Sequence, residues 1–250
     1  DELLLQLPNL KIIAKYGVGL DNIDQIACKK NNVKVGWTGG VNKLSVAEMT
    51  LGFMLDLSRN LQLTSNQLKE GLWNKSGGKQ LTGQTIGIIG LGHIGKELVR
   101  LLKPFNCSIL CHDIIEQNEY CTNENVLSVS LKELLIKSDI VTLHTPLTPL
   151  TKGMVNHSFL SSMKKDSCLI NTARGPIVVL EDLKQALNND VILGAAIDVY
   201  EIEPPQDKEL LSLPNLICTP HTGGNSSEAV VAMGKSAINH LNSFFNKTNL

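Results

Sequence analysis

The strongest constraint on the fold of this 250-residue chain is a regular alternation of short β-branched runs with helix-like segments. The runs are KIIA (11–14), VKVGW (33–37), TIGIIG (85–90), SILCHD (108–113), DIVTLHT (139–145), SCLINTA (167–173), ILGAAIDVY (192–200) and LICTP (216–220). The helix-like segments include IGKELVRLLKPF (94–105), LKELLIKS (131–138) and LEDLKQALNN (180–189). Such alternation predicts βαβ units, and therefore an α/β fold with a doubly wound, buried parallel sheet.

A longer helix is predicted over SVAEMTLGFMLDLSRNL (45–61). Ser45 is its expected N-cap, and Glu48 three residues later completes a capping box. Apolar residues then occupy nearly all sides of the helix. This pattern predicts burial in a large core or against a second subunit.

The closing segment SSEAVVAMGKSAINHLNSFFN (226–246) predicts a second long helix. We expect it to return and pack beside the N-terminal residues. The first domain would then be discontinuous, formed by residues 1–44 plus 225–250, with residues 45–224 as an inserted unit.

Charge and hydropathy exclude several classes of partner. The 23 basic and 24 acidic residues nearly cancel, so no broad charge field favours nucleic acid or an anionic membrane. The uncharged run 210–227 contains Pro, Gly, Asn, Thr and Ser, so it is not a membrane span, and no signal peptide opens the sequence. These features predict a soluble protein.

The six cysteines are scattered and lack CxxC spacing, which is typical of reduced core thiols in a cytoplasmic protein. Cys107, Cys111 and His112 lie close together in sequence and raise the question of a metal site. In a β-like stretch, however, residues four apart are separated by roughly 13 Å. One zinc ion cannot bind both thiols at that separation, so we predict no metal site.

A glycine-rich loop carries the first chemical signal. Gly90, Gly92 and Gly95 form GxGxxG directly after an apolar run and at the start of an amphipathic helix. This spacing permits a tight turn, close approach of the backbone to a pyrophosphate and close packing of helix on strand. The next run ends in Asp113, where a carboxylate can accept hydrogen bonds from ribose hydroxyls. Since residues 114–117 (IIEQ) offer no cation for a 2′-phosphate, the pattern favours NAD over NADP; the alternative is a glycine-rich turn that binds no nucleotide.

Charged and titratable residues follow three further apolar runs. Arg174 follows the run in INTARGP, Asp198 and Glu203 lie at and beyond the end of the run in AIDVYEIEPP, and His221 follows the run in ICTPHTGG. In an open parallel sheet, ligands bind outside the carboxyl ends of the strands. We therefore expect these residues on the edge that carries GxGxxG.

Together these groups suit hydride transfer on a 2-oxo acid. A guanidinium grips a carboxylate and polarises the neighbouring carbonyl, an imidazolium protonates the carbonyl oxygen, and a carboxylate favours the charged imidazole. Each residue alone also has a structural explanation. Strand-end arginines form surface salt bridges, acids before prolines decorate solvated turns, and lone histidines are often structural.

The motifs GIIGLGHIG, HTPLTPLTKGMVN, LINTARG, GAAIDVYEIEPP and LPNLICTPHTGG, in this order, resemble those of the D-isomer-specific 2-hydroxyacid dehydrogenases, most nearly the D-3-phosphoglycerate dehydrogenases. The resemblance includes KYGVGLDNID (15–24) and VNKLSVAE (41–48). It implies a Rossmann NAD-binding domain over residues 45–224 and a second, discontinuous and incomplete flavodoxin-like substrate domain. It also implies NAD in the cleft and a homodimer built around the 45–61 helix.

The resemblance further implies roles for single residues. Arg174, Glu203 and His221 match the catalytic arginine, glutamate and acid/base histidine. Cofactor binding is implied for Gly90, Gly92, His93, Ile94, Gly95, Asp113, His144, Thr145, Pro146, Thr172, Ala173, Asp198 (at the nicotinamide amide) and Gly223. Substrate binding is implied for Lys15, Val18, Gly19, Asn42 and Arg174.

Relatives of this kind usually begin earlier, so we expect the sequence to lack βα units of the substrate domain and part of the substrate pocket. The expected substrate is 3-phosphoglycerate, in serine biosynthesis. Glyoxylate, hydroxypyruvate and D-lactate are alternatives, because only Lys15 and Lys43 suggest a phosphate pocket. A different class stays open, that of corepressors with this fold, which sense NAD(H) and bind peptide partners.

Overall fold

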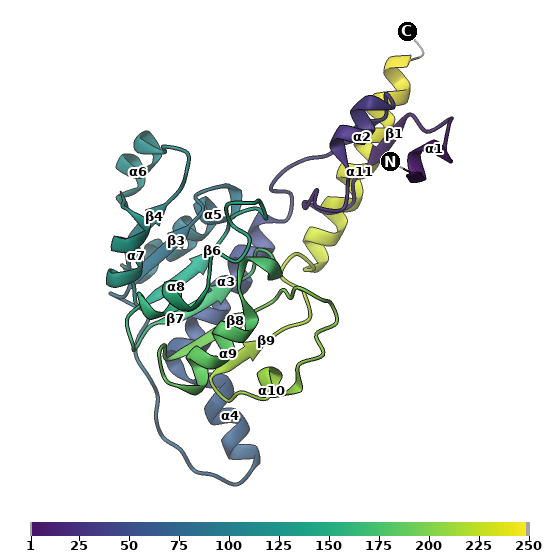
Figure 1. The fold of residues 1–250 in the computed structure, drawn as a ribbon. Coiled ribbons are helices and arrows are strands. Elements are labelled where there is room, and N and C mark those ends of the chain that lie inside the picture. Colours follow the sequence, from purple (N-terminus) through teal and green to yellow (C-terminus); the bar gives the residue numbers. More distant parts are fainter. Residues whose placement is uncertain (1, 249–250) are drawn as a thin grey trace. The chain divides into compact units, whose positions relative to one another are not determined.

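The computed structural model describes residues 2–248. The chain separates into two compact units, one formed by Asp1–Ser45 with Gly224–Leu250 and the other by Val46–Gly223 (Figure 1).

The larger unit is built on a seven-stranded sheet with the order β5-β4-β3-β6-β7-β8-β9. The strands are β3 (Thr85–Ile89), β4 (Ser108–His112), β5 (Val126–Ser128), β6 (Ile140–Leu143), β7 (Cys168–Asn171), β8 (Gly194–Ile197) and β9 (Leu216–Cys218). All neighbouring strands pair in parallel, so the predicted α/β fold with a doubly wound parallel sheet is confirmed. The edge strand β5 was not predicted, because only Val126 of its three residues is buried.

Helices cover both faces of this sheet. The helices of this unit are α3 (Lys43–Arg59), α4 (Leu61–Lys69), α5 (His93–Leu102), η1 (Lys103–Phe105), α6 (Asn118–Glu124), α7 (Leu131–Lys137), α8 (His157–Ser161), η2 (Gly175–Ile177), α9 (Leu180–Asn188) and α10 (Lys208–Leu211). One apolar cluster joins the sheet to α7, α8 and α9, and a second joins it to α3, α5 and α6. Successive strand residues alternate between the clusters, as Leu169 and Ile170 do, which explains the nearly continuous apolar runs.

The predicted capping box of the long helix is wrong. α3 begins at Lys43, so Ser45 lies inside its first turn rather than at the N-cap. The Ser45 hydroxyl instead accepts a hydrogen bond of 3.2 Å from the backbone N–H of Ser226, and Glu48 has no N-cap serine to pair with. The helix also ends before residue 61, because Asn60 adopts a left-handed φ of 53° and separates α3 from α4.

The smaller unit contains a two-stranded parallel sheet and three helices that lie wholly within it. Its elements are α1 (Glu2–Leu5), β1 (Ile12–Ala14), α2 (Gln25–Lys30), β2 (Lys34–Gly36) and α11 (Ser227–Thr248). α11 packs against both strands, and a Cβ on Gly36 would lie only 2.6 Å from Cβ of His240. His240 Nε2 also lies 2.8 Å from the Thr38 hydroxyl, so the closing helix is fixed to the N-terminal part of the chain. Over residues 2–248, no helix combines the length and apolar character that crossing a membrane requires.

Candidate functional site

The glycine-rich loop joins β3 to α5. Gly90 has a left-handed φ of 95°, and a Cβ on it would lie 2.7 Å from the His144 carbonyl oxygen. Gly95 is equally confined, since its Cβ would lie 2.4 Å from the Gly90 carbonyl oxygen. Gly92 is different: it is the N-cap of α5, and a Cβ there would meet no atom of the described chain within 4 Å. The loop therefore combines a tight turn, close helix–strand packing and one open stretch of backbone.

The start of α5 and the end of β4 meet beside this loop. His93, Ile94 and Gly95 form the first turn of α5, where backbone N–H groups precede the first intrahelical bond from Lys96 N–H to the Gly92 carbonyl. Such N–H groups favour an anion.

Asp113 follows β4 and is tied to the same loop. Its Oδ2 accepts a hydrogen bond of 2.6 Å from the Leu91 N–H, and its Oδ1 accepts one of 2.9 Å from the Ile115 N–H. Each carboxylate oxygen keeps acceptor capacity for a ribose hydroxyl.

His144, Thr145 and Pro146 follow β6, the strand next to β3. The His144 Nε2 lies 3.0 Å from the Thr142 hydroxyl, whereas its Nδ1 and the Thr145 hydroxyl are buried without a hydrogen-bond partner in the described chain. Burial lowers the pKa of His144 to about 3, so its ring is neutral at pH 7. Unpartnered buried polar atoms are costly unless a ligand or water bonds to them. Together with the open backbone at Gly92, they fit a bound dinucleotide.

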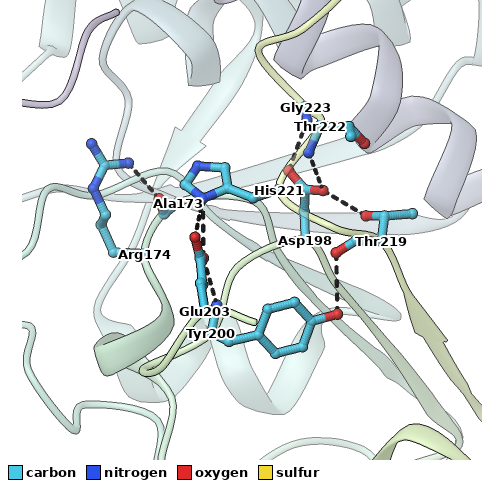
Figure 2. A network of polar contacts seen from close by, with 9 residues as sticks. All are labelled: Ala173, Arg174, Asp198, Tyr200, Glu203, Thr219, His221, Thr222 and Gly223. Atoms are coloured by element: carbon cyan, nitrogen blue, oxygen red, sulfur yellow. Dashed lines mark hydrogen bonds and ion pairs between the residues drawn. The ribbon is translucent and has the colours of Figure 1, made fainter. Parts of the chain in front are cut away.

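Thr172, Ala173 and Arg174 follow β7. The Thr172 hydroxyl is buried and lies 3.1 Å from the Thr50 hydroxyl on α3. The Arg174 side chain folds back, so that Nη1 donates a 2.6 Å hydrogen bond to the Ala173 carbonyl (Figure 2). The next residue, Gly175, fixes this loop against the one after β8, because a Cβ on it would lie 1.9 Å from the carbonyl carbon of Tyr200.

His221 and Glu203 form a hydrogen-bonded pair, brought together by the loops that follow β9 and β8 (Figure 2). Nδ1 of His221 lies 3.0 Å from Oε1 and 2.8 Å from Oε2 of Glu203. His221 has a left-handed φ of 55°, a conformation that glycine usually occupies. Glu201 and Glu203 are both exposed.

The Glu203 carboxylate is stabilised in its charged form. Burial acts to raise its pKa, but hydrogen bonds from His221 and the Tyr200 N–H, together with the positive charge of Arg174, lower the pKa below its usual range. Glu203 is therefore ionised at neutral pH and can balance a positive charge on the imidazole.

Asp198 is almost fully buried at the end of β8 and holds the segment that carries His221 (Figure 2). Its Oδ1 accepts hydrogen bonds from the Thr219 hydroxyl at 2.6 Å and from the Thr222 N–H at 2.8 Å. Its Oδ2 accepts one from the Gly223 N–H at 2.8 Å. Asp198 therefore holds residues 219–223 in place through these three hydrogen bonds. Its contact with the nicotinamide amide stays a prediction.

Apart from Arg174, the predicted substrate residues lie in the smaller unit. Lys15 Nζ donates a 3.0 Å hydrogen bond to the Asn22 side chain, and the Val18 carbonyl accepts one of 2.8 Å from the Trp37 indole N–H. Val18 and Gly19 lie in the loop between β1 and α2, so these contacts hold that loop at two points.

Asn42 lies just before α3. Its side-chain Oδ1 is buried and without a hydrogen-bond partner in the described chain. A Cβ on Gly224 would lie 2.5 Å from Asn42 Nδ2, so the amide is closely confined.

The predicted cofactor and catalytic residues of the larger unit all follow the carboxyl ends of parallel strands, at one edge of the sheet. Sequence reasoning missed the Tyr200 hydroxyl, which donates a 3.1 Å hydrogen bond to the Thr219 carbonyl. The sequence did offer a signal for this contact, since Tyr200 places a phenol hydroxyl at the end of the apolar run GAAIDVY. Over residues 2–248, no three His, Cys, Asp or Glu side chains are grouped to hold a metal ion.

Comparison with known proteins gives one family match. The model of the D-isomer specific 2-hydroxyacid dehydrogenase NAD binding domain matches residues 51–223. The chain is 39% identical over 238 residues to a hydroxypyruvate reductase of Thermotoga maritima, covering 93% of this chain and 77% of that protein. It is 39% identical over 228 residues to a D-3-phosphoglycerate dehydrogenase of Methanocaldococcus jannaschii, covering 90% of this chain but only 44% of that protein.

A solved structure is similar over nearly the whole chain. The D-lactate dehydrogenase of Aquifex aeolicus, complexed with NAD and lactic acid, superposes with a TM-score of 0.90 at 28% identity. The match covers 99% of this chain and 80% of that chain. Together with the family model, this similarity confirms the prediction of NAD as cofactor.

Proposed function

Because the chain belongs to the D-isomer specific 2-hydroxyacid dehydrogenases, NAD-dependent oxidoreductases that act on CH–OH donors, we propose that it interconverts a small D-2-hydroxy acid and its 2-oxo acid. The observation that carries this proposal is the pair of His221 Nδ1 and Glu203 Oε2, 2.8 Å apart at the edge of the sheet that bears the glycine-rich loop. A histidine held by an ionised carboxylate is suited to general acid–base chemistry.

Several residues would hold the cofactor. The open backbone at Gly92 and the N–H groups that begin α5 would receive the pyrophosphate, and Asp113 would receive the ribose hydroxyls. His144 and Thr145 would supply the buried polar atoms that have no partner in the described chain. When bound, NAD supplies the hydride acceptor.

The chain's own residues handle the proton and the substrate carboxylate. In oxidation, His221 takes the proton of the C2 hydroxyl as the C2–H bond breaks and the carbonyl forms. Since Nδ1 contacts Glu203, this proton passes to Nε2, and Glu203 stabilises the resulting imidazolium. Arg174 orients the carboxylate and stabilises the developing carbonyl, exchanging its present contact with the Ala173 carbonyl for the substrate.

We further propose that the backbone N–H groups of Val18 and Gly19 bind the substrate carboxylate, with Lys15 and Asn42 nearby. The first substrate to test is 3-phosphoglycerate, the substrate of a serine-producing reaction sequence, because Lys15 and Lys43 supply cations in this part of the chain. Hydroxypyruvate, glyoxylate and D-lactate fit the same site chemistry equally well.

The test follows the cofactor in both directions, as NAD reduction with 3-phosphoglycerate and D-lactate and as NADH oxidation with a panel of 2-oxo acids that includes hydroxypyruvate and glyoxylate. It uses the wild-type chain and two histidine variants. His221→Gln should lower kcat by about 10²- to 10⁴-fold and change KM much less. The matched control is His157→Gln, since His157 is exposed on α8 and its Nε2 lies 3.4 Å from the Ser161 hydroxyl. Near-normal turnover in His221→Gln would reject the acid/base role, and NAD binding without turnover on any 2-oxo acid would favour the corepressor class.

A second copy of the chain is the proposed partner, docked on the region of α3 and α4. α4 has no buried residue, and a helix of nine residues is only marginally stable in water without packing. Large apolar side chains are exposed on it and just after it: Leu61, Leu68, Leu72 and Trp73. We expect size-exclusion chromatography with light scattering to show a dimer that Leu68→Ser with Trp73→Ser dissociates; Leu150→Ser, at an exposed leucine outside this region, is the control.

The cysteines support a reducing compartment, and we propose the cytoplasm. All six are free, including Cys111 and Cys121, whose sulfur atoms lie 3.6 Å apart. In an oxidising compartment, two thiols at that distance would be prone to form a disulfide bond. Localisation of a tagged chain by cell fractionation tests this proposal.

A further inference from the structure

The two loops that carry His221 and Glu203 extend beyond the hydrogen-bonded part of the sheet. β8 and β9 are paired up to Ile197 and Cys218, and the last backbone bond between them joins Thr219 N–H to the Ile197 carbonyl at 3.1 Å. Glu203 lies six residues beyond β8, and His221 lies three residues beyond β9. Contacts made past the sheet must therefore set the distance between the two side chains.

Tyr200 contacts both loops. Its hydroxyl donates a 3.1 Å hydrogen bond to the Thr219 carbonyl, two residues before His221 (Figure 2). Its backbone N–H donates a 3.1 Å hydrogen bond to Oε1 of Glu203. One residue is thus bonded to the glutamate and to the segment that carries the histidine.

The surroundings of Tyr200 keep it in place. Tyr200 is only 5% exposed, and burial raises the pKa of the hydroxyl, which therefore stays protonated and donates. The backbone of Tyr200 is confined as well, because a Cβ on Gly175 would lie 1.9 Å from the Tyr200 carbonyl carbon. With its backbone confined and its ring buried, Tyr200 presents the hydroxyl to Thr219 from a fixed position.

The backbone of His221 needs such support. Its φ of 55° lies in the left-handed region, which a non-glycine residue keeps only when its surroundings determine it. Asp198 holds the N–H groups of Thr222 and Gly223 after the histidine. Before the histidine, the Asp198 bond to the Thr219 hydroxyl and the Tyr200 bond to the Thr219 carbonyl both act on one residue.

We propose that the Tyr200 hydroxyl is a positioning group, which holds the Thr219 carbonyl and thereby keeps His221 at hydrogen-bonding distance from Glu203. The proposal rests on the proposed function, in which His221 is the acid/base. Tyr200 acts through His221 and is not itself a group that meets the substrate. It differs from Asp198 in that its hydroxyl can be removed without leaving an unpaired buried charge.

The first test compares Tyr200→Phe with Tyr120→Phe. Tyr120 is the matched control, because its hydroxyl also donates to a backbone carbonyl, that of Lys96 at 3.2 Å, in the same unit. Loss of one hydrogen bond from the positioned loop should lower kcat of Tyr200→Phe about three- to tenfold. The Kd for NADH, measured by fluorescence titration, should stay within about twofold, and Tyr120→Phe should keep the wild-type kcat. Tyr200→Phe with wild-type kcat overturns the proposal.

The second measurement does not depend on turnover. Hydrogen exchange followed by mass spectrometry should show faster exchange over residues 219–223 in Tyr200→Phe than in the wild type, and no change there in Tyr120→Phe. Unchanged exchange in Tyr200→Phe overturns the positioning role, even where kcat falls. If the wild type turns over no 2-oxo acid, the proposed function fails, and the exchange measurement alone decides whether Tyr200 fixes the segment.

Discussion

Nδ1 of His221 lies 2.8 Å from Oε2 of Glu203, across 18 residues of sequence. The two side chains are 49% and 40% exposed, so water screens their attraction, and the pair contributes little to the stability of the fold. Its geometry is better explained by proton transfer, in which a nearby carboxylate balances the positive charge of the protonated imidazole.

Glu203→Gln should therefore affect the reaction more than the fold. The amide can still accept a hydrogen bond from Nδ1 but cannot balance the imidazolium, so we expect kcat at pH 7 to fall about 10- to 100-fold. Thermal melting in the same buffer should show little change. A variant that retains the wild-type kcat would contradict the role of the carboxylate.

The same variant predicts a pH dependence of stability. The folded structure lowers the pKa of Glu203, so the carboxylate contributes stability above its unfolded pKa, about 4.3, and loses it as the pH falls through the lower folded value. Because the pair is half exposed, the effect is small: urea unfolding should show a slight stability advantage of the wild type at pH 7, which shrinks below about pH 4. A difference that grows on acidification would mean that Glu203 is not stabilised as a carboxylate.

Arg174→Ala should damage both substrate affinity and rate. Its guanidinium is half-buried beside the Ala173 carbonyl, and removing a charge-assisted hydrogen bond to substrate should lower kcat/KM about 10- to 100-fold. Arg174→Lys keeps the charge but loses the planar fork, so it should recover only part of the loss. Steady-state kinetics on the best 2-oxo acid distinguish the variants; an unchanged KM in Arg174→Ala would remove the arginine from carboxylate binding.

Every strand of the described residues except β5 lies within a run that the sequence predicted. In the larger unit, a sheet buried on both faces requires apolar side chains at consecutive positions. β5 escaped prediction because only Val126 is buried in it. The start of α3 was predicted at Ser45, but the helix begins at Lys43. The local capping signal at Ser45 was misleading, because the Ser45 hydroxyl accepts a hydrogen bond from Ser226, which is far away in the sequence.

The site likewise combines features with a local cause, which the sequence predicts, and long-range contacts, which it does not. The spacing of Gly90, Gly92 and Gly95 has a local cause, since the turn and the helix packing involve neighbouring backbone. The contact between Tyr200 and Thr219 joins two loops 19 residues apart, and no periodic pattern encodes it. Contacts of this kind depend on the order of strands in the sheet, which becomes known only when the fold is.

Alanine substitutions in the glycine loop should separate folding from cofactor binding. A Cβ on Gly95 would lie 2.4 Å from the Gly90 carbonyl oxygen, so Gly95→Ala should lower Tm by several degrees as well as weaken NADH binding. A Cβ on Gly92 would meet no atom of the described chain within 4 Å, so Gly92→Ala should leave Tm nearly unchanged. Its methyl group would still obstruct a pyrophosphate, and we expect Kd for NADH to rise about tenfold or more. Calorimetry with and without NADH checks both effects; wild-type affinity in Gly92→Ala would place the pyrophosphate elsewhere.

Asp113 should determine the choice between NADH and NADPH. Its carboxylate would repel a 2′-phosphate, and residues 114–117 contain no cation. The structure places a cation beside this segment that the sequence pattern did not reveal. Lys96, on α5, donates a 2.9 Å hydrogen bond from its Nζ to the side chain of Gln117. Asp113→Ser should therefore raise the ratio of kcat/KM for NADPH to that for NADH about tenfold or more.

Lys96→Ala on the Asp113→Ser background tests the source of that gain. If Lys96 meets the 2′-phosphate, the double variant should lose most of the new NADPH activity while its NADH activity changes little. Kinetics with both cofactors on the two variants provide the measurement, and Tm values show whether losing the carboxylate that accepts the Leu91 N–H has loosened the loop. An NADPH preference that persists without Lys96 would show that relief of repulsion by Asp113, rather than attraction by Lys96, admits the phosphate.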